Sequence, residues 1–423
     1  MGVVAVGRDY HVLAAVALEV AEAGVLAHLR FLLDALFQGL HERPAVLFGP
    51  LVVFLIHLVR IAFPAIEGAL QLTLVVDSES RDEEKEGLRH KLYSHTRFSI
   101  SMGLPNTDLS KEVIKPGADL SRTDLRDSDL SEADLRGADL TGAKLCRSNL
   151  QSATLQNADL SDANLVDAQL KNANLIDSLL DYSTLDDADF TNANLTDASV
   201  REAKLSSTSF NGACAKRCDF RNAELSQTEF KNANLQNIKM ISTNVLNVDF
   251  AGANLSAAKF SDATFGDVTF TKANLTNADF SNADLTDSRD HSIQFNESIL
   301  IGADLSHAKG RGDVIFADAD LSGANLMRLD LPSPDFQNAT LSNTNLTRAG
   351  CARANVSGAY ISDSTLYKSR FHGAKFDDAT ITDTNLELTQ LNNADLGDLI
   401  ITNTDLDNAI TSGAILPDGF EKS

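Results

Sequence analysis

A large apolar residue recurs at every fifth position through most of this chain, and this spacing strongly limits its fold. From residue 118 the chain reads Ala-Asp-Leu-Ser-Arg, Thr-Asp-Leu-Arg-Asp, Ser-Asp-Leu-Ser-Glu, with a small or hydroxyl residue two places before each leucine. Five residues turn an α-helix by about 500°, so successive leucines would lie about 140° apart and form no stripe. On a flat strand they would alternate between the two faces. The pattern therefore indicates short extended pieces, each followed by a corner of two polar residues.

Phenylalanines indicate how many of these pieces close one coil. All fourteen phenylalanines between residues 101 and 416 occupy the fifth position. Five of them recur at intervals of twenty residues, as expected if rings stack in a coil of four pentapeptides: Phe190, Phe210, Phe230, Phe250 and Phe270. We predict a four-sided solenoid whose interior holds these rings together with Leu120, Leu125 and Leu130.

The Ala-[Asp/Asn]-Leu-x-x pattern resembles the pentapeptide-repeat family, and the resemblance covers residues 104–416. It implies an all-β solenoid, a right-handed quadrilateral β-helix. The array holds sixty pentapeptides, which make about fifteen coils and a rod roughly 70 Å long at ~4.8 Å per stacked strand. A disordered tract is excluded, because disorder gives no reason to keep one apolar position in phase over so many repeats.

Two irregularities interrupt the repeat. One extra residue falls between Gly310 and Phe316, where we expect a bulge because the ladders on both sides must stay in register. Upstream, Asp290 would occupy an interior position, so we expect the chain to leave the column there. These breaks are either a functional protrusion or a tolerated insertion at a corner. The first contains Arg311-Gly312-Asp313, the spelling of a cell-adhesion motif, although matches this short are frequent by chance. Arg311 and Asp313 are therefore candidate interaction residues.

The net charge excludes one class of function. The chain of 423 residues carries a net charge of −23. Residues 1–100 hold nine basic and twelve acidic residues, which leaves −20 for residues 101–423. Direct nucleic-acid binding through phosphate neutralisation is excluded by this balance. The outward residues that circle the first coils give the most acidic surface and are candidate interaction residues: Asp119, Asp124, Asp129, Asp134 and Asp139.

Two functions compete for this acidic rod. The first is a non-catalytic scaffold that binds an unknown protein partner along its faces, without a cofactor. The second follows from the resemblance, since some pentapeptide-repeat proteins protect DNA gyrase by occupying its DNA-binding saddle as a DNA mimic. We rank the scaffold first, because Asp and Asn occupy the outward position throughout the family whatever the role of the member.

The sequence contains no recognisable catalytic or metal-binding motif, so we predict that the protein is not an enzyme. The histidines of the repeat region, His291, His307 and His372, have no metal-ligand spacing. The four cysteines include no C-x-x-C pair. Cys214 falls at an outward and Cys218 at an inward position, so their side chains should point in opposite directions.

The N-terminal part is a different kind of sequence. Residues 1–76 are hydrophobic, and 77–103 form a charged linker. The apolar run over 45–59 is shorter than the roughly twenty residues of a spanning helix. We expect residues 1–76 to be helical, either as a membrane-associated segment through residues 45–63 or as non-native translation upstream of Met102. The expected location is the cytoplasm, or a membrane in the first case.

The C-terminal end of the array is apolar on its outer side. The outward position is occupied by Ile400, Ile410 and Ile415, and only the tail 417–423 follows. An open apolar coil is an edge that needs to be covered. We therefore expect self-association through the C-terminal coil.

Overall fold

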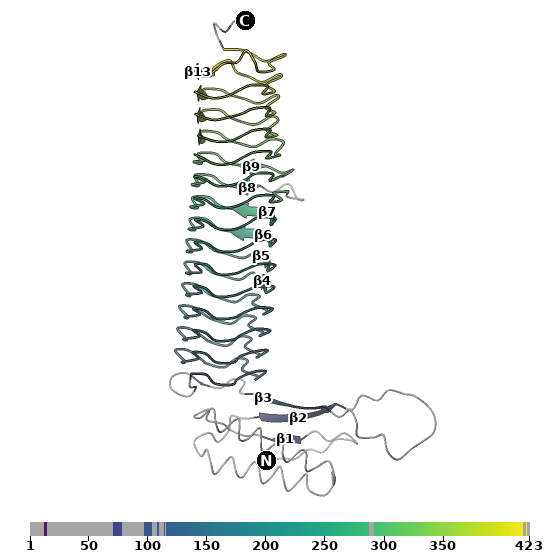
Figure 1. Ribbon diagram of the computed structural model, residues 1–423. Helices are drawn as coiled ribbons and strands as arrows, with labels where there is room; N and C mark the ends of the chain where they lie inside the picture. Colours follow the sequence, from purple (N-terminus) through teal and green to yellow (C-terminus); the bar gives the residue numbers. More distant parts are fainter. Residues whose placement is uncertain are drawn as a thin grey trace, which may run out of the picture.

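The computed structural model describes residues 12–14, 71–77, 97–103, 108–109, 114, 116–286, 292–417 and 420. From residue 116 onward these residues form a column of stacked coils (Figure 1). Each pentapeptide contributes one short extended piece, which pairs in parallel with the corresponding piece of the next coil, twenty residues further along the chain except where residues are inserted. The predicted all-β solenoid with four pentapeptides per coil is confirmed.

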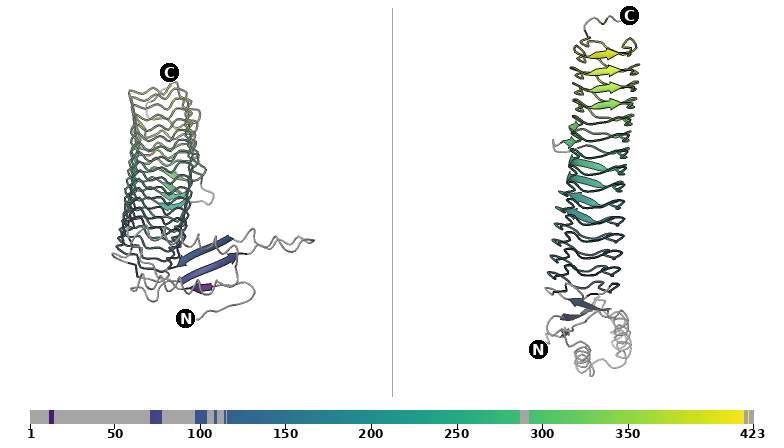
Figure 2. Two further views of the ribbon diagram at one scale, coloured as in Figure 1. Left: turned by 60° about the horizontal axis from the view of Figure 1, so that its bottom comes forward. Right: turned by 90° about the vertical axis from the view of Figure 1, so that its left-hand side faces the viewer.

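The column has four sides, because the bridges form four interleaved series along the chain. Figure 2 shows the column from two further directions. We name each side by its first outward residue: face A begins at Asp119, face B at Asp124, face C at Asp129 and face D at Asp134. The corner between two faces takes both letters. On face A, parallel bridges join fourteen outward residues, one from each coil: Asp119, Asp139, Asp159, Leu179, Ser199, Asp219, Lys239, Lys259, Asp279, Asp304, Asn325, Asn345, Thr365 and Asn385.

Longer pairings produce regular strands on three of the faces. A six-stranded parallel sheet on faces B and C contains β4 (Lys204–Ser206), β5 (Glu224–Ser226), β6 (Asn244–Asp249), β7 (Thr264–Thr269), β8 (Ile293–Gln294) and β9 (Val314–Ile315). A four-stranded parallel sheet on face D contains β10 (Thr340–Ser342), β11 (Tyr360–Ser362), β12 (Thr380–Thr382) and β13 (Ile400–Thr402).

The corners explain why Asn, Asp and Gly are so frequent after the apolar residue. At one corner the Ala193 N–H donates to the Phe190 carbonyl at 2.9 Å. The intervening Asn192 has a φ of 59°. A hydrogen-bonded turn whose second central residue alone has a positive φ is a type II turn, and Gly and Asn adopt that conformation most readily. The corner composition is therefore a direct consequence of the turn geometry.

Two residues of each pentapeptide fill the interior. Ala193 and Leu195 are fully buried, whereas Asn194 between them is half-buried. Leu120 is 4% exposed, and the other residues predicted for the interior are fully buried: Leu125, Leu130, Phe190, Phe210, Phe230, Phe250 and Phe270. The ring stack then continues through Phe295, Phe316 and Phe336, with centroids of successive rings 4.8–5.1 Å apart.

Some interior positions carry a hydroxyl in place of alanine, and the backbone satisfies it. Ser128 Oγ donates to the Leu125 carbonyl at 2.6 Å, within the same corner. Thr208 Oγ1 donates to the Leu185 carbonyl of the preceding coil at 2.9 Å. Because a buried hydroxyl without a partner is costly, these bonds explain why Ser and Thr are accepted in the column.

Both irregularities of the repeat fall at the B–C corner, in successive coils. Phe270 stacks on Phe295, 25 residues on, and Phe295 stacks on Phe316, 21 residues on. The five additional residues lie between Leu285 on face B and Ile293 on face C; they include Asp290 and lie outside the described residues. The ladders on both sides of the one-residue insertion stay in register, as predicted. Insertions at this corner therefore leave the interior stack unbroken.

Little of the predicted N-terminal helical segment is described. β1 (Val12–Ala14), β2 (Gln71–Asp77) and β3 (Arg97–Gly103) form a three-stranded antiparallel sheet, drawn at the N-terminal end of the column in Figure 1. At these residues the structure has strands where we expected a helix and a linker; the β-branched residues of β2 favour extended backbone. The apolar run over 45–63 lies outside the described residues, among which no helix is long and apolar enough to cross a membrane.

Candidate interaction surface

The outward Asp and Asn side chains stabilise the corners that follow them. At many of these positions the side-chain oxygen accepts a hydrogen bond from the backbone N–H two residues further on; Asp330 is an exception, because Pro332 has no N–H. The Ser131 N–H donates to Asp129 Oδ1 at 3.0 Å, and the Ser161 N–H to Asp159 Oδ1 at 2.9 Å. Short polar side chains commonly make such local bonds at turns. The preference for Asp and Asn at the outward position is therefore primarily structural.

All five aspartates predicted for interaction make this local bond. They circle the column, because successive pentapeptides place Asp119, Asp124, Asp129 and Asp134 on four different faces, while Asp139 lies above Asp119. The structure therefore brings only Asp119 and Asp139 together on one face, where both are exposed.

Asp124, Asp129 and Asp134 also contact cationic or amide side chains. Arg126 forms an ion pair with Asp124, and Arg136 with Asp134, each at 2.6 Å. These guanidinium groups hold the pKa of both carboxyls below its usual range. Asp129 Oδ1 accepts a hydrogen bond from Asn149 Nδ2 at 2.9 Å. Two of the five charges are thus balanced within the same coil.

Arg311 and Asp313 lie at the one-residue insertion of the B–C corner, and both are exposed. The Asp313 carbonyl accepts a hydrogen bond from the Ile293 N–H at 2.9 Å, so the insertion remains part of the stacked ladder. The tripeptide is presented on a corner of three residues between Gly310 and Val314.

A further acidic group, Asp181 at the A–B corner, is held by several donors. Its side chain is only 9% exposed. It accepts hydrogen bonds from the Ser199 hydroxyl at 2.5 Å, from the Arg201 N–H at 3.0 Å and from the Arg201 guanidinium. Burial disfavours the charged carboxylate, but these donors outweigh burial, and the pKa of Asp181 is lowered.

Replacing this carboxylate should change how stability depends on pH. The folded-state pKa lies below the unfolded value of about 3.9. The stabilisation is therefore present above about pH 4 and is lost as the pH falls through the folded-state pKa. We expect Asp181→Asn to lower the free energy of unfolding at neutral pH by about 1.5–3 kcal/mol, as for a lost hydrogen bond to a charged group. Thermal melts along an acid titration should show the two proteins converging at low pH.

Asp162→Asn is the matched control, because Asp162 lies at the A–B corner of the preceding coil and is exposed. At neutral pH its melting temperature should match that of the unsubstituted protein. A difference between Asp181→Asn and the unsubstituted protein that stays constant down to low pH would contradict the role assigned to the charge.

The cysteines point as predicted, Cys214 outward and Cys218 into the buried column. Burial raises the pKa of the Cys218 thiol well above its usual value and that of Cys351 to about 12. Buried thiols of this kind remain protonated near neutral pH and are poor nucleophiles. In the described part of the chain, no three His, Cys, Asp or Glu side chains converge so that they could hold a metal ion.

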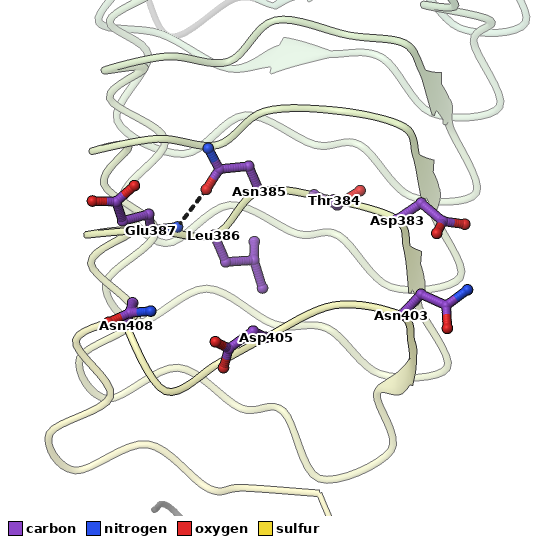
Figure 3. A pocket seen from close by; sticks show the side chains of 8 residues that line it. All are labelled: Asp383, Thr384, Asn385, Leu386, Glu387, Asn403, Asp405 and Asn408. Atoms are coloured by element: carbon purple, nitrogen blue, oxygen red, sulfur yellow. Dashed lines mark hydrogen bonds between the residues drawn. The ribbon is translucent and has the colours of Figure 1, made fainter.

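A shallow depression of about 490 Å³ lies on and beside face A near the C-terminal end. Figure 3 shows its lining, in which Asp383, Glu387 and Asp405 are spread out rather than directed at one point. The Glu387 N–H donates to Asn385 Oδ1 at 2.9 Å, which is the same local bond that supports other corners. The depression therefore presents dispersed carboxylates on the surface.

The basic residues of the C-terminal coils lie together on one side of the rod. This grouping was not predicted from the sequence. Residues 292–417 contain eight Lys and Arg residues, and seven of them lie on face B or its two corners. We call these seven the basic face: Lys309, Arg311, Arg328, Arg348, Arg353, Lys368 and Arg370. Assigning each residue to a face by the twenty-residue period, with the insertion at 311–313 allowed for, could have revealed it from the sequence.

The stacked corners, the four-sided column and the local carboxamide and carboxylate bonds define a solenoid of tandem pentapeptides. A family model described as pentapeptide repeats (eight copies) matches residues 117–151, 147–181, 183–222, 313–348, 345–383 and 369–408. A second, described as pentapeptide repeat region, matches residues 213–290. The chain belongs to the pentapeptide-repeat family.

Solved structures with a similar fold include three pentapeptide-repeat proteins. QnrB1, a plasmid-mediated fluoroquinolone resistance protein, is 16% identical over 51% of this chain and 85% of its own, with a TM-score of 0.30. HetL, involved in heterocyst differentiation regulation in Nostoc sp. strain PCC 7120, is 26% identical over 66% and 92%, with a TM-score of 0.18. A protein of the Arabidopsis thaliana thylakoid lumen is 22% identical over 30% and 66%, with a TM-score of 0.14. No curated protein matches the sequence.

Proposed function

We propose that this protein is a non-catalytic scaffold that binds a protein partner along its outer faces. The observation that supports the proposal is that the protein's polar groups divide into two sets, one with a structural role in the coils and one exposed on the faces. Buried hydroxyls bond to backbone carbonyls, outward Asp and Asn residues bond to corner N–H groups, and the inward thiols are protonated. What differs from coil to coil is the set of exposed side chains on four long faces. Solenoids of this kind bind partners through such extended surfaces.

Site-specific photo-crosslinking from each face tests this function. A photoreactive residue replaces one outward side chain per face in the C-terminal coils, at Thr365 on face A, Gln390 on face B, Asn355 on face C or Thr340 on face D. In cells that produce the full chain, we expect crosslinks to a protein from some faces and none from the others, because a partner on a rigid rod covers only part of its circumference. No protein crosslink from any of the four faces would contradict the scaffold.

A DNA-mimicking role is the second candidate, supported by the exposed Asp119 and Asp139 on face A and by the net charge. A duplex carries about two charges per 3.4 Å. The net charge of −20 over residues 101–423, divided by a rod of roughly 70 Å, gives about half that density. The ion pairs of Asp124 and Asp134 weaken the likeness further, because they place cations among the outward carboxylates.

Competition for DNA gyrase separates the two candidates. We expect that the full chain does not displace duplex DNA from the purified enzyme, because its acidic groups are fewer and partly paired. The matched variant is Asp119→Asn with Asp139→Asn. If the unsubstituted chain displaces DNA, and the double variant does so with an affinity lower by about tenfold or more, the mimic is favoured over the scaffold.

A further inference from the structure

The basic face is a cationic surface on an otherwise acidic part of the rod. Residues 292–417 contain sixteen acidic and eight basic residues. Only two of the sixteen, Asp313 and Asp330, lie on the stretch of face B and its corners that carries the seven cations. Six of these cations are exposed, and Lys368 is half-buried. Charge is therefore sorted by face, with the cations on one side of the rod.

The centre of this surface is a column at the A–B corner, formed by His307, Arg328, Arg348 and Lys368. They occupy the same corner position in four successive coils, each with a positive φ between 58° and 62°. The backbone N–H of each of the first three members donates to the carbonyl of the residue just before the next member. The Lys368 N–H donates to the corresponding carbonyl of the next coil, and all four distances are 2.9–3.1 Å. Successive side chains are thus one coil apart, about 4.8 Å.

In the described coils the three basic side chains of this column make no ion pair. Elsewhere a corner arginine lies over an aspartate one coil away, as Arg147 does over Asp127 at 2.6 Å. In this column cations instead lie over cations, and Lys368 Nζ is 4.6 Å from the centre of the Tyr367 ring. Like charges at this spacing repel one another even in water. An external anionic group would relieve that repulsion.

Two other cations of the basic face do have acidic partners, and they border the column on face B. Arg370 reaches past Gly350 to Asp330, two coils away, at 2.9 Å. Lys309 contacts Asp284 at 3.3 Å. A Cβ at residue 350 would meet the guanidinium end of Arg370 and the carboxylate of Asp330, which would both have to shift. The absence of a side chain at Gly350 thus lets Arg370 extend along the face.

We propose that the basic face binds an acidic α-helix of a partner protein, whose carboxylates form one stripe facing the column. This inference rests on the scaffold function and names its partner. The three cations of the column span two coil steps, about 10 Å, and carboxylates at i, i+4 and i+7 of a helix span about 10.5 Å. Same-side residues of an extended strand are about 6.7 Å apart, so three of them would span about 13 Å. The helical spacing fits the column more closely.

Charge on the neighbouring faces favours a protein helix over a nucleic acid. Asp304 lies on face A, and Asp335 on face C, beside this stretch of face B. A phosphate backbone wider than one face would meet these carboxylates as well as the overall charge of −20 over residues 101–423. A single helix whose acidic stripe follows the column at the A–B corner avoids the carboxylates of Asp304 and Asp335.

The test measures binding of three labelled probes to the full chain by fluorescence anisotropy. The first is a helical peptide with three Glu residues at i, i+4 and i+7, the second has the same composition with Glu spread around the helix, and the third is a single-stranded oligonucleotide. We expect the striped peptide to bind at least about tenfold more tightly than either other probe, and salt to weaken its binding. Equal binding of the two peptides, or tighter binding of the oligonucleotide, would overturn the proposal.

The double substitution Arg328→Gln with Arg348→Gln should lower the affinity for the striped peptide by at least about tenfold. The fold should tolerate it, because Gln227 has a φ of 55° at an equivalent corner position; unchanged thermal melts verify this. The matched control is Lys216→Gln with Lys239→Gln, which removes the same charge from the D–A corner and face A and should leave affinity unchanged. Equal losses in both double variants would contradict the assignment to the basic face.

Two further results separate this inference from the scaffold function. If partner crosslinks from the face-by-face experiment persist in Arg328→Gln with Arg348→Gln, the scaffold stands and the basic face is not where this partner binds. If the full chain sediments as an oligomer that this double variant dissociates, a second copy of the chain covers the surface and the acidic-helix proposal is wrong.

Discussion

Phe210→Ala should lower the free energy of unfolding by about 3–5 kcal/mol and divide the thermal transition into two. Phe210 is fully buried and stacks between Phe190 and Phe230, with ring centroids 4.8 and 4.9 Å away. It also meets the edge of Phe220 at 5.8 Å. The ladders hold the coils above and below at a fixed spacing, so the column cannot collapse into the space left by the ring. Because coils couple only to their neighbours, a weakened coil should let the two parts unfold separately.

Differential scanning calorimetry measures both effects. Leu179→Ala is the matched control, since Leu179 is an outward apolar side chain that is 42% exposed. Its loss should change stability by about 0.5 kcal/mol or less. If Phe210→Ala and Leu179→Ala unfold at the same temperature, the aromatic stack does not stabilise the rod as described.

Ala193→Leu should destabilise the column by about 1–3 kcal/mol or more, because it adds volume where nothing can move aside. Ala193 is fully buried, and its N–H donates to the Phe190 carbonyl within the corner. The adjacent Asn194→Ser should stay within about 0.5 kcal/mol, since the side chain points outward. Thermal melts of the two variants compare an inward and an outward position one residue apart. Equal melting temperatures would show that the inward and outward assignments are wrong.

The fold could be predicted because the same sequence pattern recurs in every repeat. An apolar fifth position excludes a helix and a flat strand, and the twenty-residue spacing from Phe190 to Phe270 sets four pentapeptides per coil. Phe295 and Phe316 break that spacing in the sequence yet continue the same stack in space. The positions of these two rings in the stack were known only once the ladders were seen. The spacing in the sequence alone does not show whether added residues enter the column or remain at a corner.

The candidate site was less predictable, because the sequence shows charges but not their partners. Asp124 and Asp134 read as free acidic groups, whereas arginines two residues further on pair with both. The basic face was hidden for a related reason. Arg328 and Arg348 are twenty residues apart, so the coil period places both at one corner, but the insertion at 311–313 has to be allowed for before the other members can be assigned to the same face. Surface function in such a rod depends on which residues share a face, and that grouping is three-dimensional.

The coil with 25 residues also fixes the direction in which the second half of the rod faces. Had its five additional residues entered the column as a further pentapeptide, every later residue would have advanced by one side, and the C-terminal part would be rotated by a quarter turn. Because they lie between Leu285 and Ile293 at a single corner, Asp284 and Lys309 remain in line. Residues that share a face before the insertion therefore stay in line with the residues of that face after it. A partner long enough to span both halves therefore meets one continuous side of the rod.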